Sequence, residues 1–374
     1  MNHLGNWKNG ELGDFVTLKR GFDLPQQKRE DGQVPIFSSS GITGTHSTAM
    51  VKAPGVITGR YGTIGEVFYA AKDFWPLNTT LFVEDFHGND AKFIYYFLKT
   101  LEWSKFTSAS AVPGINRNTV HKEIVSLPDI ETQRRIASTL SMFDEKIKIN
   151  TEINDNLEQQ AHSYFQELFV DNASPEWTTG TISDLGTVVG GSTPSKAKPE
   201  YYTESGIAWI TPKDLSINKS KFISHGENDI TELGLKNSSA AIMPEGTVLF
   251  SSRAPIGYIA IAAGEVTTNQ GFKSVVPKPE IGTPFVYFFL KNTLPVIEGM
   301  ASGSTFKEVS GSTMKNVPAV IPDAEILAKF SDFCAPIFAQ QRTLEEQNQS
   351  LAKLRDSLLP KLMSGEIDVS AVHL

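Results

Sequence analysis

The chain contains very little cysteine: Cys334 is the only one among 374 residues. A single thiol cannot form an internal disulfide or a cysteine-rich zinc site, and the seven histidines lack the paired spacing of a zinc site. No stretch approaches the roughly 18 apolar residues of a membrane helix, and the first ten residues do not have the pattern of a signal peptide. We therefore expect a cytoplasmic protein with no structural metal and no membrane partner.

Loops that bind phosphates or cofactors are also missing. No two glycines lie two apart, which excludes the dinucleotide motif G-x-G-x-x-G. The two glycine pairs five apart are followed by Glu11 and Ser192, so neither has the lysine of a P-loop. There is no Pro-Pro dipeptide, so the Asp/Asn-Pro-Pro-aromatic motif of amino-methyltransferases is absent. These absences predict that the chain binds no cofactor and transfers no methyl group.

A short acidic stretch superficially matches a nuclease motif. Restriction nucleases hold magnesium between carboxylates and position an attacking water, using a carboxylate and a lysine two apart on a strand. Here Glu325 and Lys329 lie four apart, at the start of a predicted helix. We therefore predict no catalytic residue and no metal-ligating residue in this chain.

The net charge of −8 does not favour nucleic acid, but the acidity is unevenly distributed. Residues 131–173 carry 4 basic and 8 acidic side chains, and residues 324–374 carry 5 and 7. Residues 1–130 are balanced at 13 and 13, and residues 174–323 carry 12 and 14. Near-neutral segments can present local basic patches, but such a protein should bind DNA weakly unless a partner adds phosphate contacts.

The sequence is a tandem duplication. FIYYFLK at residues 93–99 returns as FVYFFLK at residues 285–291, and Arg60 and Asn78 are matched by Arg253 and Asn269. Such self-similarity indicates two copies of one structural unit. Each copy begins with short runs rich in Val, Ile, Phe and Tyr between Gly and Pro, which predicts strands and loops.

A long helix should follow in each copy, because apolar residues step by four and three along residues 136–168 and again 194 residues later. We expect the two helices to pair as an antiparallel coiled coil, with Asn154 and Asn348 fixing register. Alternatively, each apolar stripe packs only on its own domain. The residues expected to pair are Phe143, Ile147, Leu157, Tyr164, Ile337, Leu344, Leu351 and Leu358.

These patterns predict an α+β protein in four segments: two mixed α/β domains and two long helices. The first domain spans residues 1–128 and its helix residues 129–170. The second domain spans residues 171–322, and residues 323–374 form the second helix and a C-terminal tail.

Candidate DNA contacts lie in polar loops. Arg60, followed by Tyr61, and Arg253, preceded by Ser252, are flanked by small residues, and an arginine fork suits guanine edges or phosphates. A structural salt bridge at a turn is the alternative for both. Small polar residues near glycine can contact phosphates or bases, although they also form ordinary turns. The further candidates are Ser38, Ser39, Asn78, Ser110, Asn116, Arg117, Ser192, Thr193, Lys196, Asn269, Gln270, Ser304 and Lys307.

The chain resembles the specificity subunits of type I restriction-modification systems over about residues 11–370. The segments that carry the resemblance are GTVVGGSTPS at 186–195, NLEQQAHSYFQELFV at 156–170 and LRDSLLPKLMSGEI at 354–367. The resemblance implies two target-recognition domains that each read half of a split, asymmetric DNA sequence. It also implies two spacer helices that dock two methyltransferase subunits and, through them, the restriction motor subunits.

Two other functions stay open at the level of sequence. The chain could be a self-sufficient DNA-modifying enzyme with an unrecognised active site, which the missing cofactor loops disfavour. It could also be a coiled-coil adaptor that does not bind DNA. Sequence-selective DNA retention by the chain assembled with a methyltransferase separates this last possibility from a specificity subunit.

Overall fold

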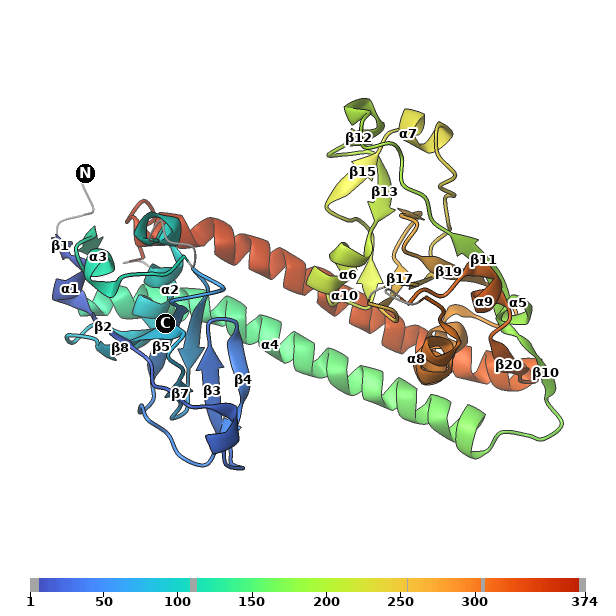
Figure 1. Ribbon diagram of the computed structural model, residues 1–374, viewed down its shortest axis with the longest axis horizontal. Coiled ribbons are helices and arrows are strands. Elements are labelled where there is room, and N and C mark those ends of the chain that lie inside the picture. Colours follow the sequence, from blue (N-terminus) through green and yellow to red (C-terminus); the bar gives the residue numbers. More distant parts are fainter. Residues whose placement is uncertain (1–6, 108–112, 254, 304–306, 370–374) are drawn as a thin grey trace. The chain divides into compact units, whose positions relative to one another are not determined.

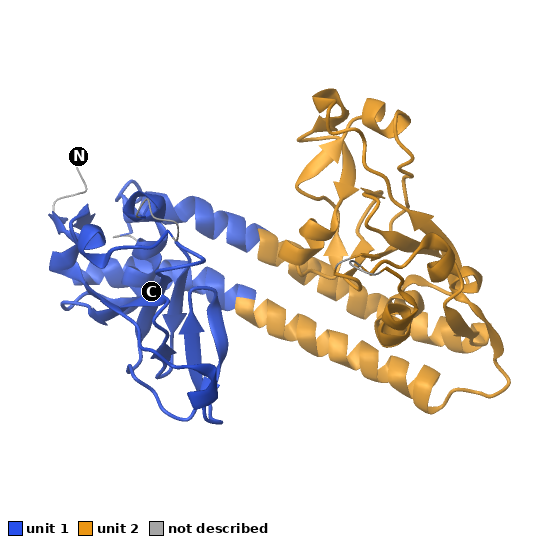
Figure 2. Cartoon of the chain, viewed as in Figure 1, with its two compact units in different colours: residues 1–147, 350–374 blue, residues 148–349 orange. Residues whose placement is uncertain are grey.

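The computed structural model describes residues 7–107, 113–253, 255–303 and 307–369. The chain divides into two compact units, coloured separately in Figure 2. Unit 1 comprises residues 1–147 with residues 350–374, and unit 2 comprises residues 148–349. Each unit therefore combines one globular domain with a part of each of the two long helices.

Unit 1 contains two main sheets and a short strand pair. The larger sheet has the order β2-β8-β5-β6 with antiparallel neighbours, and the smaller has the order β4-β3-β7. The strands are β1 (Lys8–Glu11), β2 (Thr17–Arg20), β3 (Val34–Ser38), β4 (Gly41–His46), β5 (Gly55–Gly59), β6 (Val67–Ala70), β7 (Trp75–Pro76), β8 (Thr80–Asp85) and β9 (Ile124–Leu127). The helices of this domain are α1 (Leu12–Phe15), α2 (Ala91–Lys99) and α3 (Arg117–His121).

Unit 2 is built in the same way around the second copy. Its larger sheet has the order β11-β19-β16-β17-β14 and its smaller sheet the order β12-β15-β13-β18. The strands are β10 (Thr178–Thr181), β11 (Gly186–Gly190), β12 (Tyr202–Thr203), β13 (Ile207–Ile210), β14 (Phe222–Ile223), β15 (Asn228–Ile230), β16 (Val248–Phe250), β17 (Ile259–Ala262), β18 (Thr267–Thr268), β19 (Lys273–Pro277) and β20 (Pro318–Ile321). The helices are α5 (Ile182–Leu185), α6 (Pro212–Ile217), α7 (Glu232–Lys236), α8 (Thr283–Met300) and α9 (Gly311–Lys315).

The repeated aromatic segment forms the helix that covers the larger sheet in each unit. In unit 1 it is α2, which packs against β5 and β6, and the Asp90 carboxylate caps its first turn by accepting from the backbone N–H of Phe93 at 2.8 Å. In unit 2 it is α8, which packs against β16, β17 and β19. The sequence duplication is thus a duplication of fold.

The two predicted long helices are present as α4 (Ile130–Gln166), extended by a π-helical turn (Glu167–Asp171), and α10 (Ala324–Met363) (Figure 1). Their pairing can be followed within unit 2. The Asn150 amide donates to Asn348 Oδ1 at 2.9 Å, and Tyr164 lies 4.5 Å from Phe333 between ring centroids. As residue numbers rise along α4, those of the contact partners on α10 fall. The predicted antiparallel pairing is therefore confirmed.

Both polar positions predicted for the helix seam lie in contacts between α4 and α10. Asn348 accepts from Asn150, which is fully buried. The Asn154 amide donates to Gln341 O at 3.4 Å, and the Gln341 amide donates to Asn154 O at 3.1 Å. The spacing of 194 residues between the two copies does not give contact partners in an antiparallel pair, so the sequence indicated these positions without their partners.

The eight predicted seam residues all lie at least partly buried. Ile337 and Leu344 are buried, and Phe143, Ile147, Leu157, Tyr164, Leu351 and Leu358 are half-buried. Both helices also pack on the second domain: Phe288 of α8 lies 5.8 Å from the Phe165 ring of α4 and 6.1 Å from the Phe330 ring of α10. Cys334 belongs to this core, where burial raises its pKa to about 12 and keeps the thiol unreactive. The helices thus use their apolar faces both on one another and on the sheets.

A buried ion pair fastens the second domain to both helices within unit 2. The Lys221 ammonium, at the start of β14, lies 2.5 Å from Glu158 Oε2 on α4 and donates to Gln341 Oε1 on α10 at 2.7 Å. Lys291 of α8 also pairs with Glu158, at 2.6 Å. Burial would raise the pKa of Glu158, but the positive charges of Lys221 and Lys291 outweigh it and leave that pKa lowered.

Breaking this pair should destabilise the protein strongly. Glu158→Ala leaves the Lys221 ammonium, which is 6% exposed, without its carboxylate, so we expect a loss of about 3 kcal/mol in unfolding free energy. The double variant Glu158→Leu with Lys221→Met removes both charges and should recover much of that loss. Denaturant titration of the three proteins measures this, and a single variant as stable as the parent would contradict the assignment.

Candidate nucleic-acid interface

In unit 1 the loop after β5 lies at the centre of the predicted residues. The backbone N–H of Arg60 donates to Thr79 O at 2.8 Å, and Arg60 O accepts from Ile115 N at 3.0 Å. A Cβ at Gly59 would lie 1.8 Å from Thr63 O, so only glycine allows the loop to fold back this tightly. These contacts bring the loops around residues 60, 79 and 115 together.

The side chains of this cluster differ in how firmly they are held. The Arg60 guanidinium lies 4.6 Å from the centre of the Tyr61 ring, and no carboxylate of the described residues forms an ion pair with it. Asn78 donates to Asp23, which also binds Arg20 at 3.2 Å. Arg60 is therefore an uncompensated cation on an aromatic platform, whereas Asn78 is engaged within the protein.

The remaining predicted residues of unit 1 lie in turns. Ser38 accepts from the backbone of Ser40 at 3.2 Å and donates to Gly41 O at 3.1 Å, which shapes the β3–β4 turn. Ser39 borders the Arg60 loop, since a Cβ at Gly62 would lie 3.2 Å from its hydroxyl. Asn116 caps α3, whose exposed first residue is Arg117. Ser110 lies outside the described residues.

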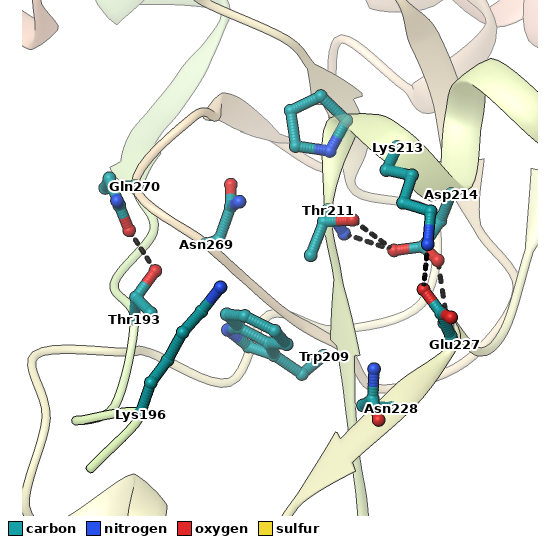
Figure 3. A pocket seen from close by; sticks show the side chains of 11 residues that line it. Thr193, Lys196, Trp209, Thr211, Lys213, Asp214, Glu227, Asn228, Asn269 and Gln270 are labelled. Atoms are coloured by element: carbon teal, nitrogen blue, oxygen red, sulfur yellow. Dashed lines mark hydrogen bonds and ion pairs between the residues drawn. The ribbon is translucent and has the colours of Figure 1, made fainter. Parts of the chain in front are cut away.

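In unit 2 four predicted residues line one pocket: Thr193, Lys196, Asn269 and Gln270 (Figure 3). The backbone of Ser192 donates to Thr268 O at 2.9 Å, which ties the loop after β11 to the Asn269–Gly271 turn. The Thr193 hydroxyl donates to Gln270 Oε1, and the N–H of Gly271 donates to Asn269 Oδ1 at 2.8 Å. The structure therefore brings together residues that the sequence placed 76 positions apart.

The sequence did not indicate the other residues that line this pocket, which are Trp209, Thr211, Pro212, Lys213, Asp214, Glu227 and Asn228. Trp209 lies on β13 and its indole N–H donates to Ser192 O at 3.0 Å, which positions the loop. A buried tryptophan in a strand has the sequence signature of ordinary core, so no pattern identified it. Lys213, in the first turn of α6, and Asn228, at the start of β15, are isolated polar residues that carried no signal.

The carboxylates at the pocket are already occupied. Asp214 accepts from the backbone and hydroxyl of Thr211, at 2.7 and 2.6 Å, and from the backbone of Glu227 at 2.8 Å. The Thr-x-x-Asp spacing is that of a helix capping box, so Asp214 has a structural role. Glu227 pairs with Lys213 at 2.5 Å, and its hydrogen bond and charge raise the pKa of Lys213. Glu227 is thus paired with a cation, and the Asp214 carboxylate is held by three hydrogen bonds.

Arg253 is held differently from its counterpart Arg60. Its guanidinium donates to Gln270 O at 3.1 Å and lies 3.4 Å from Glu308, which also lies 3.9 Å from Lys273. Burial lowers the pKa of Lys273 more than the charge of Glu308 raises it. Arg253 therefore forms an ion pair and braces the turn that carries Gln270, and its contact with DNA stays a prediction.

The other predicted residues of unit 2 divide between core and surface. Ser252 is fully buried and donates to Gly271 O at 3.1 Å, so its side chain supports the turn and is not presented at the surface. Lys307 is exposed, and Ser304 lies outside the described residues.

The described residues hold no group of three or more His, Cys, Asp or Glu side chains placed to bind a metal ion. Within the same ranges, no helix combines the length and apolarity required to span a bilayer.

Comparison with known proteins identifies the family. Residues 5–159 and 175–352, most of the chain, match the family described as "Type I restriction modification DNA specificity domain". The chain belongs to this specificity family. Two copies of the specificity domain account for the duplication and for the repeated fold of the two units.

Individual relatives of the specificity family agree with this. The MjaIX specificity subunit of Methanocaldococcus jannaschii is 38% identical over 51% of this chain, which spans 44% of that protein, less than half its length. The HindI specificity subunit of Haemophilus influenzae is 24% identical over 72% of this chain and 75% of its own length. The crystal structure of the S subunit from M. genitalium superposes with a TM-score of 0.63 over 97% of both chains at 19% identity, which shows a shared fold.

The different environments of the two arginines predict different effects of their removal on stability. Arg253→Ala should lower the unfolding free energy by about 1 kcal/mol, because an ion pair and a hydrogen bond to Gln270 O are lost at a half-exposed site. Arg60→Ala should change it by less than about 0.5 kcal/mol. Thermal unfolding of both variants checks this, and equal losses at the two positions would contradict the distinction.

Proposed function

We propose that this chain is the DNA sequence-specificity subunit of a type I restriction-modification complex and catalyses nothing by itself. In this proposal it binds a bipartite, asymmetric DNA target, with each unit reading one half. The observation that carries the proposal is that each unit gathers polar side chains from separate loops, around Arg60 in unit 1 and around Gln270 in unit 2. Membership in the specificity family supports it.

The cation–aromatic pair of unit 1 suits direct contact with DNA. Arg60 has no carboxylate partner among the described residues, so binding a guanine edge or a phosphate would not first break an ion pair. A bidentate arginine–guanine contact contributes about 1 to 3 kcal/mol of discrimination. We therefore assign Arg60 the principal role in unit 1, with Tyr61 as its platform and Ser39, Asn116 and Arg117 at its borders.

The charge of the chain indicates that tight DNA binding requires a partner protein. The two domains are close to neutral and the helices are acidic, so few phosphate contacts are available from the chain alone. We propose that two methyltransferase subunits dock on the helices, supply the missing phosphate contacts and recruit the restriction motor subunits. The exposed apolar side chains Met142, Ile149 and Ile153 on α4 are consistent with a covered surface there.

A self-sufficient DNA-modifying enzyme has less support, because the described residues contain no metal cluster and the sequence has no cofactor loop. Turnover by the purified chain with S-adenosylmethionine or magnesium would support the enzyme function instead. An adaptor without a role in DNA binding leaves the polar pocket of unit 2 and the free Arg60 cation without a function.

Exchange of one domain tests the assignment of one half-site to each unit. Replacing residues 11–128 with the equivalent domain of another specificity subunit should change one half of the methylated sequence and leave the other half intact. Methylation mapping of the variant complex gives the result. A change in both halves would contradict the model, and the matched exchange of residues 175–322 should alter only the other half.

A further inference from the structure

One side of the unit 2 pocket, formed by Lys196, Asn269 and Gln270, presents hydrogen-bond donors, whereas the carboxylates of Asp214 and Glu227 lie on the opposite side (Figure 3). Both side-chain amide oxygens of the Asn269–Gly271 turn accept hydrogen bonds from the protein: Gln270 Oε1 accepts from Thr193 (Figure 3), and Asn269 Oδ1 accepts from Gly271 N at 2.8 Å. The groups left to face a ligand are therefore the two amide nitrogens. Each carries two N–H donors and no acceptor.

A third donor lies beside them. Lys196 is exposed and extends along the pocket near Trp209 and Asn269 (Figure 3). Among the described residues no carboxylate pairs with it, whereas Lys213 on the other side of the pocket is bound to Glu227. The free cation and the two amide nitrogens thus lie on the same side of the pocket.

We propose that this donor set reads guanine in the half-site bound by unit 2, with Gln270 as the specificity-determining residue. In the major groove guanine presents two adjacent acceptors, N7 and O6, and matches a set of donors. Adenine pairs with an asparagine or glutamine through one donor and one acceptor, and here each amide oxygen already accepts a hydrogen bond from the protein and is oriented toward that donor. The inference rests on the proposed function, because it requires that unit 2 binds DNA.

Two positioning residues hold the Gln270 amide in this orientation. The Thr193 hydroxyl donates to Gln270 Oε1 and so leaves the amide nitrogen of Gln270 to point outward. Arg253 donates to Gln270 O at 3.1 Å while Glu308 neutralises its charge, so Arg253 orients the turn without contacting DNA. The two copies of the repeat therefore read DNA by different chemistry, since unit 1 uses the arginine itself.

Base analogues in the assembled complex with methyltransferase subunits test the inference. Once the half-site of unit 2 is mapped, each guanine in it is replaced in turn by 7-deazaguanine, which lacks the N7 acceptor. We expect one replacement to weaken binding about 10-fold or more, because a donor loses its partner. A half-site without guanine, or unchanged affinity at every guanine, overturns the inference while leaving the proposed function intact. Failure to find any bipartite target would instead overturn the proposed function.

A second variant tests the orientation of the amide directly. Thr193→Val removes the hydroxyl and frees Gln270 Oε1, so the amide can offer an acceptor as well as a donor. We expect adenine to be accepted at the position that required guanine, with the ratio of guanine to adenine affinity falling about 10-fold. The matched control is Thr187→Val, at an exposed position on β11, which should leave that ratio unchanged. An unaltered ratio in a Thr193→Val protein with a parental melting temperature would contradict the role of Thr193.

Discussion

The buried contact between Lys221 and Glu158 is the constraint on which unit 2 depends. An ammonium that is 6% exposed is unstable in a protein interior unless charge and hydrogen bonds compensate it, and here Glu158 and Gln341 do so from two different helices. The backbone of Lys221 also donates to Glu345 of α10 at 2.7 Å. One residue at the start of a strand thus fixes the sheet to α4 and α10 together, and an apolar contact would not have this directional specificity.

In unit 1, other residues attach the domain to the two long helices. Asp144 of α4 accepts from the hydroxyl of Tyr96 on α2 and pairs with Arg355 of α10 at 2.5 Å. In both units a carboxylate on α4 therefore joins the repeated aromatic helix to the helix pair. The loops that carry Thr193, Gln270 and Arg60 extend from these sheets and are joined by hydrogen bonds within the protein.

Much of the fold could be predicted because it rests on local and periodic signals. The duplication, the two helices and their antiparallel pairing follow from repeated segments and heptad steps along the chain. The partner of Asn348 could not be found in this way, because it depends on the stagger between two helices that are remote in sequence. Lys221 gave no signal either, since a lysine before a short strand is usually solvent-exposed.

Part of the candidate interface could also be predicted from local sequence signals. Small polar residues near glycine indicated the loops around Thr193, Asn269 and Arg60, which the structure brings into clusters. Whether each side chain is free or engaged is decided by tertiary neighbours: Glu308 neutralises Arg253, and burial removes Ser252 from the surface. Chemically equal arginines in the two copies thus lie in different environments, which the sequence alone did not distinguish.

The central claim is that the two units read two separate pieces of DNA. It is tested most directly by sequencing the methylated sites in a host that carries this chain together with its methyltransferase and restriction subunits. The account predicts one asymmetric motif made of two specific blocks separated by a gap of fixed length and free sequence. A single continuous motif, or methylation that does not depend on this chain, would contradict it.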